Sequence, residues 1–135
     1  MTDVAPTPTI EGRIELRDPS SLIPHPANPR RGDVDAIAES IRENGWHGVV
    51  TVQESTGRVI VGWPRSQAAV AVGLPLIPVE FIDCDDADAL RKVLADNRAS
   101  DLASTDRRAL VEALRYLEGE DALLGALYSD ADLDV

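Results

Sequence analysis

Apolar positions along the chain follow two periods, and each period predicts one kind of element. Residues that alternate between apolar and polar, or that form short apolar runs between turn signals, are typical of strands. Four segments fit this description: 10–16, 49–53, 58–61 and 76–82. The second and third are expected to form a hairpin, because only a tight turn at Ser55-Thr56-Gly57 separates them. The fourth is expected near a sheet edge, since Pro75 and Pro78 cannot donate to a strand ladder.

Two helices are predicted in the first half of the chain, where apolar residues recur every three or four positions between capping residues. The first follows Asp33, whose carboxylate can cap a helix, and it ends at Asn44-Gly45. The second takes Pro64 into its first turn and ends at Gly73. The segment from Asp18 to Gly32 contains four prolines and is therefore expected to be a loop without regular structure.

Two further helices are predicted in the second half. The third follows the acidic run at 83–88 and reaches Asp96-Asn97-Arg98; its expected buried residues are Ala87, Leu90, Val93 and Leu94. The acidic run lacks the spacing of an EF-hand calcium loop, so its aspartates are expected to stabilise the start of this helix. The fourth helix is expected to begin at Thr105 after a break at 100–104, and a short amphipathic turn follows at 123–127. Its expected buried residues are Leu110, Val111, Leu114 and Leu117.

The length of 135 residues indicates one domain. There is no run of about 20 apolar residues and no export leader, so the protein is expected to be cytoplasmic and to stay out of membranes. The single cysteine, Cys84, excludes an internal disulfide and a cysteine-based zinc cluster.

The formal net charge of -11 argues against a protein whose whole surface embraces DNA, because such surfaces need clustered Lys and Arg. The acidity is uneven, since every charged residue from Glu118 to Val135 is acidic. Arginines stand instead at the ends of predicted elements: Arg30, Arg31, Arg65, Arg98, Arg107 and Arg108. A local positive pocket within an acidic surface suits a small anionic ligand.

The junction between the third predicted strand and the second predicted helix is the main candidate for chemistry. An apolar strand stops at Gly62, and a helix begins with Arg65 in its first turn. Glycine permits a close backbone approach, and a helix start offers N–H groups with partial positive charge, so the junction suits a phosphate group. Arg65 would add a planar fork of donors. A plain strand-to-helix turn with a solvated arginine is the alternative.

Several short motifs follow one another in the chain. They are Asn28-Pro29-Arg30, Ser40-Ile41-Arg42-Glu43-Asn44-Gly45, Gly62-x-x-Arg65-x-x-Ala68-Ala69, Gly73-Leu74, Ile77-Pro78-Val79 and Ala95-Asp96-Asn97-Arg98. Their order over residues 10 to 117 resembles the ParB N-terminal domain of the ParB/sulfiredoxin superfamily. The part from Leu123 to Leu133 resembles ParB-type domains of phage and mobile-element proteins, often fused to a DNA methyltransferase. The resemblance implies an α+β fold, with a small mixed β-sheet and helices packed on it.

The same resemblance implies a nucleotide site. In this family the Gly-x-x-Arg box holds nucleotide phosphates, and a later helix end assists with phosphate and Mg²⁺. Carried over to this chain, the expected phosphate-binding residues are Gly62, Arg65, Ser66, Asn97, Arg98 and Arg30. Asp96 is the expected carboxylate near Mg²⁺. Family members bind CTP or ATP and use it to close a dimer or gate an interaction, so the expected partners are a nucleotide and either a protein partner or a second copy. No catalytic residue is assigned.

The chain also departs from the family pattern. Trp63-Pro64 replaces small residues or histidine in the phosphate box, which narrows the entrance and removes an N–H donor. The cysteine that sulfiredoxin chemistry needs is missing there. Trp46-His47-Gly48-Val49 replaces a Gln-Pro segment that shapes the base pocket and the catalytic water, so hydrolysis is expected to be weak or absent. The helix-turn-helix of partitioning ParB and its C-terminal dimerisation domain are absent, so DNA is expected to bind weakly or through a partner.

Two histidines and two tryptophans leave alternatives open. His25 and His47 have no sequence-adjacent carboxylate, so packing within a loop is favoured over acid–base catalysis. Trp46 and Trp63 can stack on a base, but filling a core or a groove lip is the favoured interpretation.

The preferred function is a stand-alone, nucleotide-binding accessory or regulatory protein with at most weak NTPase activity. One alternative is a DNA-processing nuclease, which would need a metal cluster of carboxylates or histidines. Another is a nucleotide-independent interaction module whose acidic surface binds a basic partner. The expected organisation is a flexible segment at 1–9, a ParB-like domain at 10–117 and an acidic helical extension at 118–135.

Overall fold

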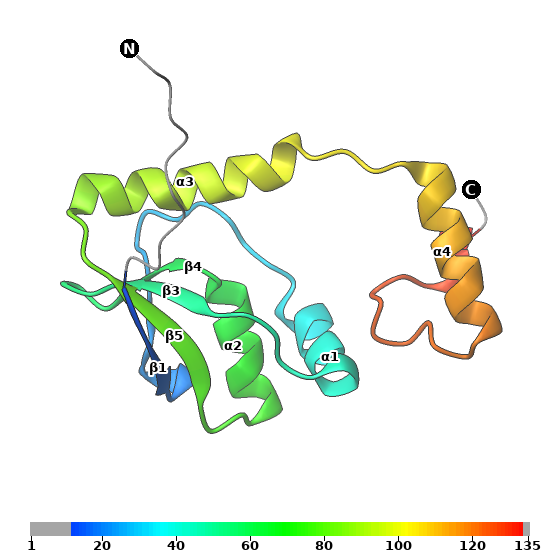
Figure 1. Ribbon diagram of the computed structural model, residues 1–135, viewed down its shortest axis with the longest axis horizontal. Helices are drawn as coiled ribbons and strands as arrows, with labels where there is room; N and C mark the ends of the chain where they lie inside the picture. Colours follow the sequence, from blue (N-terminus) through cyan, green and yellow to red (C-terminus); the bar gives the residue numbers. More distant parts are fainter. Residues whose placement is uncertain (1–11, 134–135) are drawn as a thin grey trace, which may run out of the picture.

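The computed structural model describes residues 12–133, which form a mixed five-stranded sheet with helices on both faces (Figure 1). The strands are β1 (Arg13–Arg17), β2 (Ile23–Pro24), β3 (Val50–Gln53), β4 (Arg58–Val61) and β5 (Ile77–Ile82). The helices are α1 (Val34–Asn44), α2 (Trp63–Val72), α3 (Asp86–Leu102) and α4 (Arg107–Gly119), with 3-10 turns η1 (Pro19–Ser21) and η2 (Asp130–Leu133). The predicted α+β fold class is confirmed. The segment 1–9 and the start of the strand predicted at 10–16 lie outside the described residues.

The strands lie in the order β1-β5-β3-β4-β2. β3 and β4 form the predicted antiparallel hairpin, and β1 is antiparallel to β5, whereas β5 runs parallel to β3 and β2 parallel to β4. β5 stands next to the edge strand β1, as expected, but it is paired on both sides despite Pro78. Successive N–H groups point to opposite sides of a strand, so one proline removes one donor and leaves the other bonds of the ladder intact.

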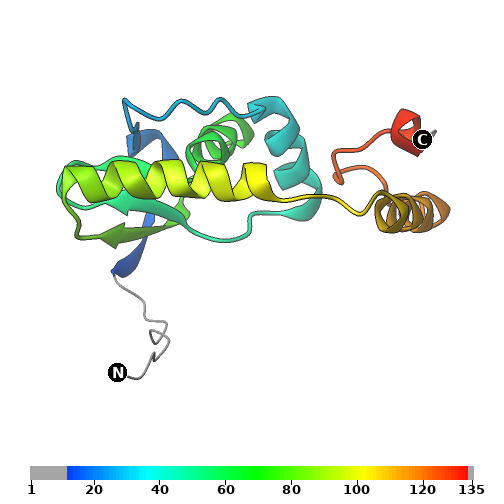
Figure 2. The ribbon, with the colours of Figure 1, turned by 90° about the horizontal axis from the view of Figure 1, so that it is seen from above.

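Helices lie on both faces of the sheet (Figure 2), and the core has a cluster on each face. On one face α2 packs through Ala69 against Val50, Val52, Val59, Ile77 and Val79. On the other face α3 packs through Ala89 and Val93 against Ile60 and Ile82. α1 rests on α2 through Ala38, Ile41 and Ala68. The start of α2 is thereby held at one end of the sheet, between α1 and α3. Among residues 12–133, no helix has the length and apolar character needed to cross a bilayer.

The proline-rich segment 18–32 is more regular than predicted. Its first part forms the 3-10 turn η1, capped by Asp18, whose carboxylate accepts a hydrogen bond of 2.9 Å from the Ser20 N–H. Its second part forms the two-residue strand β2 beside β4. Proline is compatible with both, because its fixed φ suits the first turn of a helix and it is tolerated in an edge strand.

The buried face of α3 also differs from the prediction. Val93 is buried and Leu90 half-buried as expected, but Ala89 is buried in place of Ala87 and Leu94, which are both exposed. Two adjacent apolar stripes run along this helix, and periodicity alone cannot decide which one faces the sheet. At its start the Asp85 carboxylate accepts from the Asp88 N–H at 2.8 Å, so one residue of the acidic run stabilises the helix start as its N-cap, and Asp86 and Asp88 lie in the first turn.

The predicted break at 100–104 is wrong in part, because α3 continues to Leu102. The N-cap of α4 is Asp106 and not Thr105, since the Asp106 carboxylate accepts from the Ala109 N–H at 3.1 Å. The predicted inward face of α4 is confirmed, with Leu114 buried and Leu110, Val111 and Leu117 half-buried.

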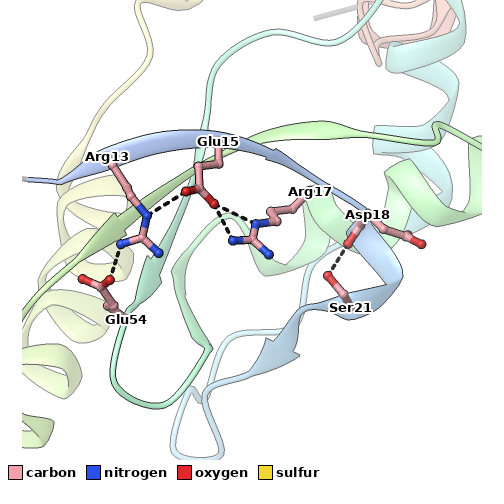
Figure 3. A network of polar contacts seen from close by, with 6 residues as sticks. All are labelled: Arg13, Glu15, Arg17, Asp18, Ser21 and Glu54. Atoms are coloured by element: carbon pink, nitrogen blue, oxygen red, sulfur yellow. Dashed lines mark hydrogen bonds and ion pairs between the residues drawn. The ribbon is translucent and has the colours of Figure 1, made fainter.

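Charged residues alternate along the edge strand β1 and form a surface network (Figure 3). Glu15 lies between two arginines and accepts hydrogen bonds from Arg13 Nε at 2.8 Å and from Arg17 Nε at 3.0 Å. Arg13 also pairs with Glu54. Both guanidinium groups lie over the Phe81 ring of β5, 4.8 Å and 5.0 Å from its centroid. The hydrogen bonds from Arg13 and then Arg17 lower the pKa of Glu15 below its ordinary value.

We predict that Glu15→Gln removes an acid-sensitive part of the stability. A carboxylate whose folded-state pKa is lowered stabilises the fold above the ordinary glutamate value of about 4.3, and this contribution is lost as the pH falls through the lowered value. Thermal unfolding between about pH 7 and about pH 3 should therefore show a shallower loss of stability in the variant than in the wild type. The difference should be small, since exposed pairs are screened by water.

Glu112→Gln, at an exposed position on α4, is the control that removes one negative charge elsewhere. Identical acid profiles for the wild type and Glu15→Gln would contradict the prediction.

Candidate functional site

A cavity of about 340 Å³ lies between the start of α2, the loop that precedes α1 and the later part of α3. Its polar lining comes from three separate parts of the chain: Asn28, Arg30, Arg65, Asp96, Asn97 and Ser100. Gly62, Trp63 and Pro64 complete the wall at the helix start. The volume falls within the range of about 300 to 1,000 Å³ that is usual for small-molecule sites. The structure therefore brings together Arg30, Gly62, Arg65, Asp96 and Asn97 from the predicted set.

Gly62 is the N-cap of α2 and has a left-handed conformation, with φ of 99° and no side-chain cap. A Cβ atom at this position would also lie 3.2 Å from Val50 Cγ2, so both conformation and space favour glycine. The helix start is left without a side chain that would shield its N–H groups. Pro64, in the first turn, lacks an N–H, so the helix start offers one donor fewer than usual.

Arg65 stands between this cavity and a second one. Its Nη1 atom donates to the His47 carbonyl oxygen at 3.2 Å, and its Cζ atom lies 5.9 Å from the centroid of the Trp46 ring. The second cavity, of about 280 Å³, is lined by Arg65 and Trp46 together with Ile37, Ile41 and Leu127. No described carboxylate forms a salt bridge with Arg65. Its positive charge is therefore available to an anion.

The loop before α1 is tied to α3 by hydrogen bonds. Asn28 Oδ1 accepts from the Arg30 N–H and from Asn97 Nδ2, both at 3.0 Å. Arg30 Nη2 donates to the Asn97 carbonyl oxygen at 2.9 Å and to Asp101 Oδ1 at 2.6 Å. The charge of Arg30 is thus already paired with Asp101. Arg30 therefore holds the loop in place. Of the two arginines that line the cavity, Arg65 is the one without a carboxylate partner among the described residues.

The same loop also packs closely on the start of α2. A Cβ atom at Gly32 would lie 2.5 Å from both Cβ and Cγ of Pro64, so only glycine fits at this position. Glycine at 32 and proline at 64 therefore form a matched contact behind Pro64, which lines the cavity.

Asp96 is the carboxylate that lines the cavity, and it is exposed. Within residues 12–133, no group of three or more His, Cys, Asp or Glu side chains lies close enough to hold a metal ion. The nuclease alternative requires such a group.

Two residues of the predicted set do not line the cavity. Ser66 is buried, its Oγ donates to the Trp63 carbonyl oxygen at 2.7 Å, and it faces the side of α2 that carries η1. Arg98 is exposed on α3 outside the cavity lining. Each follows a lining residue by one position, and one position turns a side chain by roughly 100° around a helix.

The histidines occupy loop positions. His25 is buried, and its Nδ1 accepts from the Ala27 N–H at 3.1 Å. His47 is exposed, and its Nε2 lies 3.2 Å from the Asn44 carbonyl oxygen. Trp46 and Trp63 are half-buried against the core, and the Trp46 Nε1–H donates to the Gly48 carbonyl oxygen at 2.8 Å.

The predicted site set missed two polar lining residues, Asn28 and Ser100. Asn28 belongs to the noted Asn28-Pro29-Arg30 motif but has no site role in that set. Ser100 lies four residues after Asp96, on the same face of α3. The helical spacing was visible in the sequence, but the predicted break at 100–104 placed Ser100 outside the helix.

No protein-family model matches the sequence, and no curated protein matches it. Among solved structures, the chain is similar to the C-terminally truncated chromosome-partitioning protein ParB from Caulobacter crescentus complexed with CTP-γ-S. The TM-score is 0.74 and the identity 20%, over 90% of this chain and 75% of that chain. It is also similar to a Pnob8-like ParB-N domain, with a TM-score of 0.53 and 12% identity, over 82% of this chain and 49% of that chain. At these low identities, the structural similarity shows a shared fold and no more.

Proposed function

We propose that this chain, which has the fold of the ParB N-terminal domain, binds a nucleoside triphosphate, CTP or ATP, and acts as an accessory or regulatory protein with weak or absent hydrolysis. The observation that carries the proposal is the position of Arg65, which lacks a carboxylate partner, at a glycine-capped helix start in a cavity shared with Asn97 and Asp96. The Caulobacter protein of the same fold is complexed with a CTP analogue.

Phosphate binding would use the start of α2. Charge-assisted hydrogen bonds from a guanidinium are stronger than neutral ones, and a triphosphate offers oxygens that match the fork of Arg65. The present contact of Arg65 with the His47 carbonyl is long, at 3.2 Å, and pairs the cation only with a neutral group. Replacing the His47 carbonyl oxygen with a phosphate oxygen as the hydrogen-bond partner of Arg65 is therefore favourable in free energy. The N–H groups and dipole of the helix start add to the attraction.

The Asn28–Asn97 pair would form the opposite wall of the site. Its hydrogen bond fixes the loop to α3, and the paired Arg30 and Asp101 hold that loop from the outer side. Two amide side chains next to a phosphate site offer donors and acceptors to ribose hydroxyls and phosphate oxygens.

Mg²⁺ would accompany the nucleotide, held by Asp96 and phosphate oxygens. Mg²⁺ prefers oxygen ligands, keeps several waters and is commonly bound through one or two carboxylates together with substrate phosphates. A single lining carboxylate fits this mode. When bound, the ion would neutralise phosphate charge.

The segment 46–49 supports the proposal that hydrolysis is weak or absent. Its one titratable side chain, His47, has Nε2 beside the Asn44 carbonyl oxygen, and the Trp46 indole is bonded to the Gly48 carbonyl. Both side chains are therefore engaged within their own loop. A residue that activates water must instead lie within hydrogen-bond reach of that water at the phosphate.

The direct test of the function is a titration of labelled CTP, ATP and GTP into the protein, with and without Mg²⁺. We expect saturable binding of CTP or ATP that strengthens with Mg²⁺. Failure of all three nucleotides to bind would leave the interaction-module alternative as the better one.

We predict that Arg65→Ala weakens nucleotide binding by about 1.5 to 3 kcal/mol, which is a factor of about 10 to 150 in Kd. The expected cause is loss of the cation at the helix start. Calorimetry at fixed Mg²⁺ gives the affinity, and Arg115→Ala, on the exposed side of α4, is the control with the same change in net charge. Equal affinity of Arg65→Ala and wild type, with the fold intact, would remove Arg65 from the site.

We predict that Trp63→His combined with Pro64→Gly raises nucleotide affinity. The exchange restores the missing N–H donor at position 64 and widens the entrance. Stacking of Trp63 on the base predicts the opposite, a loss of about 1 to 3 kcal/mol. Calorimetric titration of the double variant separates the two explanations: tighter binding supports an occluded entrance, and weaker binding supports stacking of Trp63 on the base. Pro64→Gly alone is the matched control, because it restores the donor while Trp63 stays in place.

We predict that the protein binds duplex DNA weakly and without sequence preference. The net charge of -11 motivates this, since DNA affinity depends on clustered cations. A mobility-shift titration at several salt concentrations measures it, with a scrambled duplex of equal length as the control. Sequence-dependent binding below about 1 µM at physiological salt would contradict the prediction.

A further inference from the structure

The chain after α4 turns back toward α1, as Figures 1 and 2 show. We call residues 122–129 the strap. It is attached to α1 where Asn44 Nδ2 donates to the Gly125 carbonyl oxygen at 3.0 Å, and its Leu127 lines the second cavity together with Trp46 and Arg65. The strap therefore shares this cavity with Arg65, the residue that carries the proposed phosphate site.

The attachment of the strap depends on an unusual backbone. Gly125 has φ of +91° and Leu127 has φ of +67°, a region that residues with a side chain rarely adopt. A Cβ atom at Gly125 would lie 2.6 Å from Glu43 Cβ, so the close approach of the strap to α1 requires glycine there. Among the described residues, a single hydrogen bond, from Asn44, joins α1 to this segment with its two left-handed residues, so the segment is suited to opening.

Two features of the closed strap oppose phosphate binding. Arg65 is turned toward Trp46 and the His47 carbonyl, on the side of the second cavity, which Leu127 also lines. In addition, the strap itself carries no charged residue, but the charged residues on both sides of it, from Glu118 to Asp121 and from Asp130 onward, are all acidic. These flanking carboxylates raise the electrostatic cost of bringing in a triphosphate.

We propose that residues 122–129 are an autoinhibitory strap that keeps Arg65 on the Trp46 side and lowers affinity for the triphosphate until it is displaced. This regulation rests on the proposed nucleotide function. Because coupling between two binding events is reciprocal, strap release strengthens nucleotide binding, and nucleotide binding favours strap release by the same factor.

The test uses Gly125→Ala in the full chain, with Gly119→Ala as the matched control. Alanine at 125 meets Glu43 and must adopt a positive φ, whereas a Cβ at Gly119 meets nothing within 4 Å. Hydrogen exchange over 122–129 is measured first, without nucleotide. We expect faster exchange in Gly125→Ala and wild-type exchange in Gly119→Ala. Leu127→Ala, which removes the side chain at the second cavity, should act in the same direction as Gly125→Ala.

The second measurement is CTP and ATP affinity of the same proteins with Mg²⁺. We expect Gly125→Ala to bind about 5-fold or more tightly than wild type and Gly119→Ala to bind like wild type. Saturating nucleotide should also speed exchange of the strap in wild type.

Equal or weaker binding by Gly125→Ala, with its strap shown to be detached, overturns the strap proposal and leaves the nucleotide function standing. Slow exchange of the strap in both Gly125→Ala and Leu127→Ala also overturns it. If no protein of the set binds any triphosphate, the proposed function itself fails and the regulation fails with it.

Discussion

The close packing of α2 on its neighbours is the constraint on which the candidate site depends. Ala69 lets the helix lie directly on the sheet, and Ala68 lets α1 lie directly on α2. Both alanines are fully buried. Larger side chains at either position would push the layers apart, since interiors are packed as densely as organic crystals. This packing sets where the left-handed Gly62 releases the chain into the helix, and therefore where Arg65 and the helix dipole point.

The second wall of the site depends on polar rather than apolar contacts. The loop around Asn28 has no helix or strand to hold it, and its position follows from hydrogen bonds to α3 and from the contact of Gly32 with Pro64. These contacts are exposed or half-buried, so each one stabilises the loop only modestly. The cavity thus combines a rigid wall at α2 with a wall that can adjust to a ligand.

Electrostatics sort the arginines of this acidic protein into two groups. Arg13, Arg17 and Arg30 are paired with carboxylates and serve the fold. Within residues 12–133, Arg65 forms no salt bridge, and its partners are a carbonyl oxygen and an aromatic ring. Other arginines such as Arg98 and Arg115 also form no salt bridge, but Arg65 differs from them in lining the cavity at the start of α2. In a chain of net charge -11, this position is a better indicator of an anion site than the number of arginines. In the proposed regulation, the strap and the acidic residues on both sides of it control access to this arginine.

Local patterns in the sequence determined which segments became helices and strands, because periodicity, caps and glycine terminators act within a few residues. Asp33, Asp85, Gly62 and Gly73 occupy the roles that such rules assign to them. The motif order likewise indicated the fold and the glycine-to-arginine junction.

Only the tertiary structure decided which stripe of α3 is buried, that β5 is paired on both sides, and that Ser100 lines the cavity while Ser66 and Arg98 do not. The side chains depend on how a helix is rotated about its axis, by about 100° per residue, and the pairing of β5 depends on which strands lie beside it. Local sequence leaves both open, and long-range packing settles them.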